Sequence, residues 1–374
     1  MIKWIAPLVS LLLALLVAEG LCRVFFETTF SSRPMAPGIR YDIRWGPIHE
    51  PGADYVSESP TGGQSFRMSI NSHGFRNPEI PAASAGRFRI AFIGDSFTEG
   101  YGVEFEEGFV ALSERALQER VGDSEVETIN MGMRGGSPST YWRQLERTLE
   151  LSPDGLVLVA YDNDLSDDFH YSYSLDPIRS DVYRAIDWLP FDSRLVETFA
   201  EIFVRARYER ALSRSEEIVG GQPLRASEWN FGAGTVDADP VGFYARPGLW
   251  ERHWATSRDY LARIATEVAS RGVKFAIAYI PCPQIGIHGD CCQGLYPVAE
   301  GKRPGEENVF RDWLRELAAE QDVPFIDVSE KFLELEALGD QELVYLPDDG
   351  HLNERGNAIV ADVIADRLRG WVDE

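Results

Sequence analysis

The stretch that decides the fold is Gly94-Asp95-Ser96-Phe97-Thr98-Glu99-Gly100, which directly follows the run Phe88-Arg89-Ile90-Ala91-Phe92-Ile93. The β-forming residues of that run predict a short buried strand. A strand that ends in a glycine turn, with a helical pattern soon after it, places the Ser96 hydroxyl at the carboxyl edge of a sheet, where open α/β sheets hold their ligands. The same pattern also suits a tight turn in which Ser96 caps the next helix. Residues elsewhere in the chain must decide between the two.

Strand and helix patterns alternate from residue 88 onward. Alternation of this kind is typical of a parallel sheet covered by helices on both faces, which makes the predicted fold class α/β. The predicted strands cover residues 88–93, 126–130, 156–161, 273–280 and 323–328, and the predicted helices lie near 108–121, 139–150, 247–271, 306–320 and 354–369.

Two segments depart from this alternation. Residues 30–86 are rich in Pro, Gly and Ser with short alternating runs, which predicts a β-rich lead-in packed on the domain that starts at residue 87 and continues to residue 374. Residues 71–74 indicate a turn, so His73 is predicted to be a turn residue rather than a catalyst. Residues 164–245 are too many for a connecting loop and predict an inserted lid or cap.

The N-terminal segment is apolar. An uncharged run from Trp4 to Ala18 separates Lys3 from Glu19 and Arg23, and its length of about 22 Å falls short of a hydrocarbon core of roughly 30 Å. Residues 1–26 become long enough if the two later charges reach the interface. A signal anchor with a transmembrane helix is favoured, and a signal peptide cut near residues 18–20 is the alternative. Both predict an extracytoplasmic catalytic domain on the periplasmic or extracellular side, secreted if the segment is cleaved.

The formal charge of −24 argues against nucleic acid as a partner, because a phosphate backbone would be repelled. Three cysteines, Cys282, Cys291 and Cys292, lie within an eleven-residue stretch. In an oxidising compartment a disulfide from Cys282 to one of the adjacent pair is favoured, with free thiols or zinc as alternatives. Their pairing stays open.

A serine nucleophile needs a base within hydrogen-bond reach and a group that orients the base. His351 lies in Pro347-Asp348-Asp349-Gly350-His351, after a late predicted strand and just before the last helix, so it is placed on a loop at the sheet edge. The Asp-x-x-His spacing allows a carboxylate to fold back onto the imidazole. His170 has the same spacing after Asp167, but it opens the insertion and is the weaker candidate.

Together these motifs resemble the SGNH (GDSL) hydrolase family. Gly94-Asp95-Ser96 follows the first strand, a glycine loop follows the second, Asn163 follows the third and an Asp-x-x-His motif lies near the C-terminus. The resemblance covers about residues 88–163 and 340–369. It implies a flavodoxin-like three-layer α/β/α sandwich with a mainly parallel sheet, and the activity of a serine ester hydrolase that works through an acyl-enzyme.

The resemblance also implies residue roles. Ser96 would be the nucleophile, His351 the general base and Asp348 the group that orients His351, with Asp349 as the alternative at a shorter spacing. The oxyanion hole would consist of the Ser96 N–H, the Gly135 N–H and the Asn163 side-chain amide. Gly132 is a less favoured alternative for the glycine. Where the family usually has a glycine two residues before the asparagine, this chain has Tyr161.

The predicted substrate is a small acyl ester, with an O-acetyl group on an extracytoplasmic glycan as the favoured case. One alternative is an O-acetyltransferase of cell-surface polysaccharide, and another is a non-catalytic glycan-binding or assembly protein that retains the fold. No cofactor and no metal are predicted, because the acidic run Asp162, Asp164, Asp167 and Asp168 is interpreted as a solvated surface rather than a cation site. The oligomeric state is not indicated.

Overall fold

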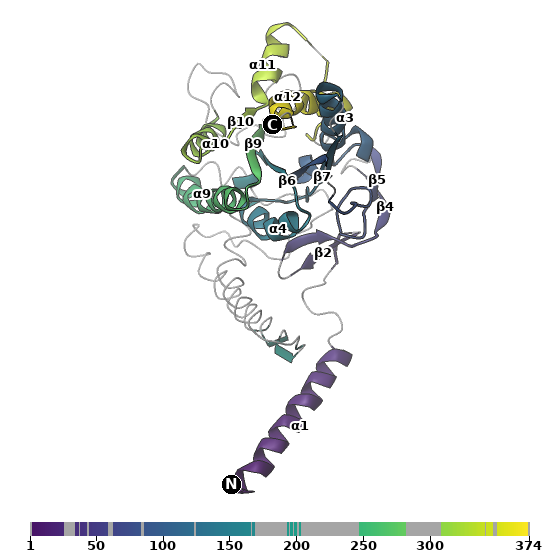
Figure 1. Ribbon diagram of the computed structural model, residues 1–374, viewed down its shortest axis with the longest axis vertical. Coiled ribbons are helices and arrows are strands. Elements are labelled where there is room, and N and C mark those ends of the chain that lie inside the picture. The colour runs from purple at the N-terminus through teal and green to yellow at the C-terminus, as the bar shows by residue number, and fades with distance from the viewer. Residues whose placement is uncertain are drawn as a thin grey trace.

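The structure is a computed structural model (Figure 1). It describes residues 2–25, 34–36, 38–42, 45–58, 63–83, 86–122, 125–165, 167–168, 193, 195–196, 198–199, 202, 247–281, 308–340, 342–346 and 350–372.

The centre of the molecule is a five-stranded parallel sheet, as predicted. Its strands are β6 (Arg87–Gly94), β7 (Glu125–Asn130), β8 (Gly155–Tyr161), β9 (Lys274–Ile280) and β10 (Phe325–Asp327). Their spatial order is β10-β9-β8-β6-β7 and every neighbouring pair is parallel. With β6 counted as the first strand this is the flavodoxin-like order 2-1-3-4-5, which changes direction between β6 and β8. All seven residues of β8 are buried, as expected for a central strand of a two-sided sheet.

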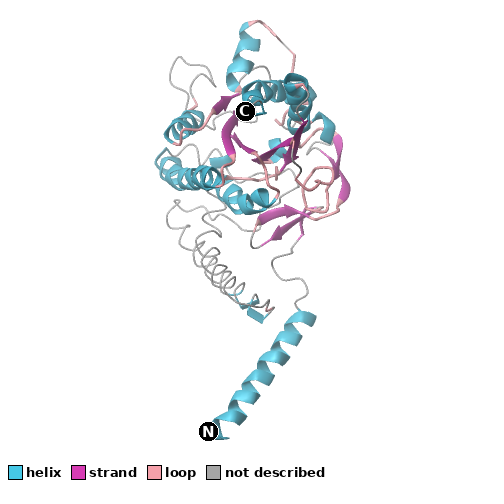
Figure 2. Cartoon of the chain, in the orientation of Figure 1, coloured by secondary structure: helices cyan, strands magenta, loops and turns pink. Residues whose placement is uncertain are grey.

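Helices cover both faces of this sheet, so the predicted three-layer α/β/α sandwich is confirmed (Figure 2). One layer consists of α3 (Phe109–Val121), α11 (Ser329–Ala337) and α12 (Glu354–Val372), and the other of α4 (Pro138–Glu150), α9 (Pro247–Ser270) and α10 (Val309–Glu320). Alternate residues of β6 face opposite layers, because Phe92 belongs to the core with α3 and α12, while Ala91 and Ile93 belong to the core with α4, α9 and α10.

The stretch before the sheet contains five short strands. β1 (Pro34–Ala36), β2 (Ile39–Asp42) and β3 (Gly46–His49) form an antiparallel sheet, and β4 (Asp54–Glu58) pairs with β5 (Ser65–Ser69). The Gln144 amide of α4 donates to Pro47 O at 3.0 Å, so β3 contacts the central domain directly. The division into a lead-in and a hydrolase domain stays a prediction.

A tight turn follows β5, as predicted. Asn71 Oδ1 accepts hydrogen bonds from the backbone N–H groups of His73 and Phe75, both at 3.0 Å. Gly74 has a φ of 81°, a conformation that favours glycine. His73 is exposed in this turn.

Residues Ile2–Phe25 form one helix, α1. In the part of the chain that the structure describes, no helix has both the length and the apolarity needed to cross a membrane, so the membrane helix predicted for residues 1–26 is not supported. Glu19 accepts hydrogen bonds from Ser193 Oγ and from Leu195 N, both at 2.9 Å. We predicted the Glu19 side chain at a lipid interface, whereas in the structure Glu19 is hydrogen-bonded to residues 193 and 195.

Some predicted features differ or cannot be placed. β10 is shorter than the predicted strand 323–328. Before His351 the described residues contain an isolated bridge between Tyr345 and Leu352 in place of the late strand. The three loop cysteines, most of the predicted lid at 164–245, His170 and both candidate aspartates, Asp348 and Asp349, lie outside the described residues.

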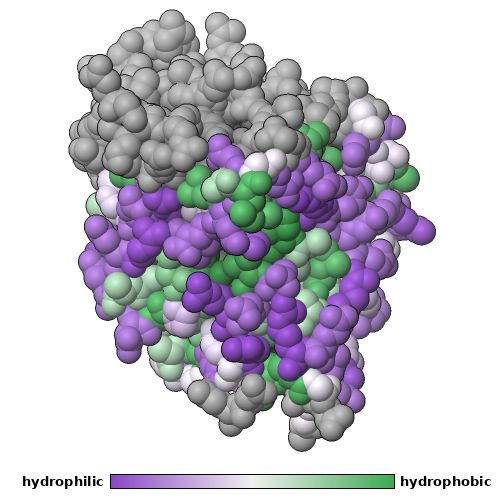
Figure 3. Space-filling view, turned by 90° about the horizontal axis from the view of Figure 1, so that it is seen from above, coloured by the Kyte–Doolittle hydropathy of each residue, from purple (hydrophilic) through white to green (hydrophobic). Residues whose placement is uncertain are grey.

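The face in Figure 3 is mostly hydrophilic, with a patch of apolar residues near its centre. A largely polar surface agrees with the high acidic content of the sequence.

Candidate active site

Two of the predicted site residues follow neighbouring strands at the point where the strand order reverses. Ser96 comes directly after β6, Asn163 follows β8, and these two strands pair in parallel from Ile90 to Gly94. Ligands of open α/β sheets bind at this switch point, outside the carboxyl ends of the strands.

Ser96 is the first residue of a very short helix, α2 (Ser96–Glu99). Asp95 caps this helix by accepting a hydrogen bond from Phe97 N at 2.9 Å. A Cβ on Gly94 would lie 2.1 Å from Thr98 Oγ1 and 2.8 Å from Val159 O, so only glycine allows the chain to turn this tightly after β6. The Ser96 residue is 8% exposed.

The structure brings His351 to Ser96 across 255 residues of sequence, and His351 Nε2 lies 2.8 Å from Ser96 Oγ. The loop that holds His351 is fixed by the Leu346 N–H, which donates to His351 O at 2.6 Å. The imidazole ring packs against the rings of Phe97 and Tyr101, with centroid distances of 4.8 and 4.7 Å. A hydroxyl and an imidazole at hydrogen-bond distance have the geometry that a nucleophile and its base require in acyl transfer.

The glycine loop after β7 distinguishes between the two candidate oxyanion donors. The Gly132 N–H donates to Asn130 Oδ1 at 2.8 Å, and a Cβ on Gly132 would lie 2.1 Å from Glu99 N. Gly132 therefore serves close packing against α2, and its N–H is occupied. Gly135 has a φ of 69°, in the left-handed region. Gly135 stays the predicted oxyanion donor.

The aspartates on either side of Asn163 are held by hydrogen bonds from other elements. Asp162 accepts hydrogen bonds from Tyr279 Oη and Asn308 Nδ2, both at 2.8 Å. Asp164 accepts one from Tyr141 Oη at 2.9 Å. Tyr161, which stands where the family usually has glycine, stacks on Phe97 at 3.9 Å. The Asn163 loop is thereby tied to both the sheet and the nucleophile helix.

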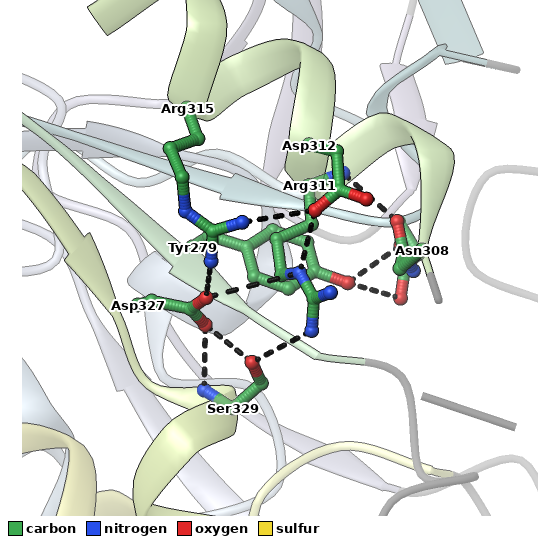
Figure 4. Close-up of polar contacts among 8 residues, drawn as sticks. Tyr279, Asn308, Arg311, Asp312, Arg315, Asp327 and Ser329 are labelled. Atoms are coloured by element: carbon green, nitrogen blue, oxygen red, sulfur yellow. Dashed lines mark hydrogen bonds and ion pairs between the residues drawn. The ribbon is translucent and has the colours of Figure 1, made fainter. Parts of the chain in front are cut away.

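A second polar cluster supports this loop (Figure 4). Asn308, the N-cap of α10, accepts from Arg311 N at 2.8 Å while its amide binds Asp162. The Arg311 guanidinium lies between Asp327 and Ser329, with Nε 3.8 Å from Asp327 Oδ2 and Nη1 3.4 Å from Ser329 Oγ. The start of α10 and the end of β10 therefore hold Asp162 in place.

The acidic run from residue 162 to 168 is not the solvated surface that we predicted. Asp162, Asp164 and Asp168 are fully buried. Asp168 accepts hydrogen bonds from Ser139 N at 2.9 Å and Ser257 Oγ at 2.5 Å, so it connects α4 with α9. Among the described residues, no group of three or more His, Cys, Asp or Glu side chains is arranged to hold a metal ion.

Burial raises the pKa of Asp95, the residue before Ser96, and of Asp167, in the acidic run. The pKa of Asp95 rises to about 6, mainly through burial, against the opposing effects of the Phe97 N–H and His351. The pKa of Asp167 rises to about 8, through burial and the nearby Asp95 and Asp168 carboxylates. A carboxyl group with a raised pKa binds more protons in the folded than in the unfolded state, so its contribution to stability is lost as the pH rises through this range.

Asp167→Asn is therefore expected to stabilise the protein, and to do so more at pH 8 than at pH 5. Asparagine keeps the shape but removes the charge that becomes costly between about pH 4 and pH 8, and the difference should be about 1–3 kcal/mol. Thermal unfolding at the two pH values measures it, with the exposed Asp366→Asn on α12 as control. An equal effect of Asp167→Asn at both pH values would contradict the raised pKa.

Three buried ionisable residues near the site were not predicted. Glu99, one turn after Ser96, is fully buried and lies 2.8 Å from His49 Nε2 and 2.9 Å from Arg134 Nε. Burial alone would raise the pKa of Glu99, but Arg134 and His49 more than offset this and lower it to about 2. The sequence signal for this cluster is a charged residue, Glu99, that stands between a predicted buried strand and Gly100.

The parallel sheet between two helix layers, with the Ser96–His351 pair at its switch point, has the architecture expected of an α/β/α hydrolase. The family model described as "GDSL-like Lipase/Acylhydrolase family" matches residues 92–359, more than two thirds of the chain. The chain belongs to this family and is a hydrolase that acts on ester bonds. No curated protein matched the sequence.

Several solved structures are similar to this chain at low identity. An acetyl xylan esterase, AlAXEase, is 16% identical, with 75% of this chain and 100% of that chain covered and a TM-score of 0.40. The lipase/acylhydrolase from Enterococcus faecalis is 15% identical, with 76% and 96% covered and a TM-score of 0.38. The esterase EstA from Pseudoalteromonas sp. is 13% identical, with 76% and 99% covered and a TM-score of 0.39.

Proposed function

We propose that this protein cleaves small acyl esters through an acyl-enzyme on Ser96, with O-acetyl groups on an extracytoplasmic glycan as the substrate class. The observation that carries the proposal is the 2.8 Å contact between Ser96 Oγ and His351 Nε2 at the switch point of the sheet. In this mechanism His351 removes the hydroxyl proton as Ser96 attacks the ester carbonyl, and the proton then passes to the departing alcohol. In a second step, a water molecule attacks the acyl-enzyme and releases the acyl group as the free acid.

The developing oxyanion would be stabilised by the N–H groups of Ser96 and Gly135 and by the Asn163 amide. Ser96 begins α2 and Gly135 stands at the turn after β7, so both donors belong to backbone that is fixed before substrate binds. Preorganised donors of this kind typically contribute about 10²–10³ in rate each.

Crowding around Ser96 supports a small acyl group. Ser96 is only 8% exposed. The rings of Phe97 and Tyr101 pack on the His351 ring, and the Tyr161 ring stacks on Phe97. Tyr161 adds an aromatic ring where the family usually has only a glycine hydrogen. A long acyl chain would find less room here than acetate.

A chain-length series tests the substrate class. With p-nitrophenyl esters, kcat/KM is expected to fall at least tenfold from acetate to octanoate. Acetylated xylan should release acetate, which an enzymatic acetate assay measures. A preference for octanoate contradicts the small-acyl proposal. An oligosaccharide acceptor is added in a further assay. If mass spectrometry shows more acetylated oligosaccharide than free acetate among the products, the protein is a transferase instead.

For the group that orients His351 we propose Asp348, on the sequence spacing alone. Asp348→Asn is expected to lower kcat about 10²-fold, because an asparagine cannot stabilise the imidazolium that forms during attack. Asp349→Asn is the matched control and should stay within about threefold of the wild type. The reverse ranking assigns the role to Asp349.

We also propose that the catalytic domain is extracytoplasmic, on the apolar character of residues 1–26. Fusion of the first 30 residues to β-lactamase without its own signal should confer ampicillin resistance on a bacterial host. Sensitive cells that nevertheless accumulate the fusion protein argue for a cytoplasmic enzyme.

A further inference from the structure

Glu99 is a buried charged residue at the end of α2, the short helix that begins with Ser96. Its carboxylate is fully buried, and it accepts contacts from His49 Nε2 at 2.8 Å and Arg134 Nε at 2.9 Å. His49 comes from β3 and is itself only 2% exposed. We call His49, Glu99 and Arg134 the Glu99 cluster.

Stability alone is a weak reason for such a cluster. Removing charges from water costs several kcal/mol each, and buried ion pairs can often be replaced by apolar residues without loss. The pKa of Glu99 is lowered to about 2, so its charge is present at any ordinary assay pH. The Glu99 carboxylate therefore presents a constant negative charge to its neighbours.

The nucleophile helix needs support from outside. With four residues, α2 is far shorter than a helix that is stable by itself. The buried guanidinium of Arg76 donates from Nη1 to Glu99 O at 3.2 Å and to Gly100 O at 2.5 Å, and so satisfies the end of the helix. Through Arg134, the Glu99 carboxylate is one attachment of the same helix to the loop after β7.

Through Arg134 the cluster reaches both remaining parts of the site. Arg134 is the residue before Gly135, the proposed oxyanion donor. Its guanidinium also lies 4.8 Å from the Tyr101 ring centroid, and the Tyr101 ring packs 4.7 Å from the ring of His351. One carboxylate thus ties together the segment that carries the nucleophile, the segment that supplies an oxyanion donor and a ring that packs on the base.

We propose that Glu99 and His49 are positioning residues that act through Arg134 to hold the Gly135 N–H and the Ser96 hydroxyl in the arrangement that the tetrahedral intermediate requires. This inference rests on the proposed esterase function. Loss of the cluster should misplace the oxyanion donor, while leaving the residues that contact the rest of the substrate in place. The effect should then fall on kcat and on the binding of tetrahedral analogues, and little on KM.

The central experiment compares Glu99→Gln with the wild-type full chain. Kinetics with p-nitrophenyl acetate should show kcat lowered about 30- to 100-fold and KM within about threefold. The inhibition constant of phenylboronic acid, which forms a tetrahedral adduct on a serine, should rise by a similar factor. Thermal unfolding is recorded for every variant.

His49 offers a matched pair of substitutions. His49→Leu removes the imidazole whose Nε2 lies 2.8 Å from the Glu99 carboxylate and should lower kcat about tenfold, whereas His49→Gln keeps a polar N–H group at this position and should stay within about threefold of the wild type. The exposed His73→Leu is the control for losing a lead-in histidine. If His49 only filled space, leucine and glutamine would have similar effects on kcat. A smaller loss with glutamine than with leucine therefore indicates that the polar contact to Glu99 matters.

Arg134→Lys covers the case in which Glu99→Gln does not fold. Lysine keeps the positive charge at position 134, where the arginine side chain is 12% exposed, but it lacks the planar guanidinium. Both kcat and the affinity for phenylboronic acid should therefore fall about tenfold. The inference is overturned if these variants keep wild-type kcat, if only KM changes, or if boronate affinity is unaffected. A wild-type protein without esterase activity would instead reject the proposed function, and the inference with it.

Discussion

Ser96→Ala is expected to lower kcat/KM for p-nitrophenyl acetate by about 10⁴-fold or more, to the level of the buffer reaction. The hydroxyl lies 2.8 Å from His351 Nε2 and is the atom that would form the acyl-enzyme. An alanine removes only the Oγ atom from a site already shaped by the Asp95 cap and the close packing at Gly94, so the fold should remain. Steady-state kinetics and thermal unfolding on the same preparations measure both quantities.

Ser113→Ala is the matched control, because it removes a buried serine hydroxyl from α3, outside the predicted site. It should keep wild-type activity. A fluorophosphonate probe should label the wild type and Ser113→Ala but not Ser96→Ala, with the adduct located on the Ser96 peptide by mass spectrometry. Equal turnover by wild type and Ser96→Ala, or labelling of another serine, would reject Ser96 as the nucleophile.

His351→Ala should lower kcat about 10³- to 10⁴-fold, because His351 is the residue that the described part of the chain places within hydrogen-bond distance of Ser96 Oγ to take its proton. Its neighbours Phe97 and Tyr101 leave a ring-shaped gap when the imidazole is lost. Added imidazole should therefore restore part of the activity in His351→Ala and none in Ser96→Ala.

The double variant tests whether the two residues act as one unit. Ser96→Ala combined with His351→Ala should be no less active than Ser96→Ala alone, because a base without a nucleophile contributes nothing. His73→Ala, in the exposed turn after β5, serves as the control for a histidine change. Full activity of His351→Ala at neutral pH would remove this residue from the mechanism.

The sequence was sufficient for the sheet, the helix layers and the Ser96–His351 pair. Periodicity is strong in continuous buried strands such as β8, and the motifs stand at strand ends, where parallel topology gathers them. Predicted helices such as 139–150 agree with α4 to within one residue. The late strand expected before His351 is replaced in the described residues by a single bridge, in which Tyr345 pairs with Leu352 across the His351 loop.

The buried polar groups could not be predicted in the same way. Charged residues are usually exposed, so the run from Asp162 to Asp168 was interpreted as solvated, yet three of its aspartates are fully buried. Their partners Tyr141, Ser257 and Asn308 come from three different helices or their caps, and sequence spacing contains no information on such long-range pairs. The pairing of His49 with Glu99 was missed for the same reason.

That pairing bears on where the smallest working enzyme begins. The family model starts at residue 92, whereas His49 and Arg76, which reach the nucleophile helix from upstream, lie before it. A truncation designed on the family boundary would remove both the imidazole that contacts Glu99 and the guanidinium that donates to the carbonyl groups at the end of α2. Protein engineers who trim or graft this hydrolase should therefore treat residues 45–83 as part of the catalytic unit rather than as a dispensable extension.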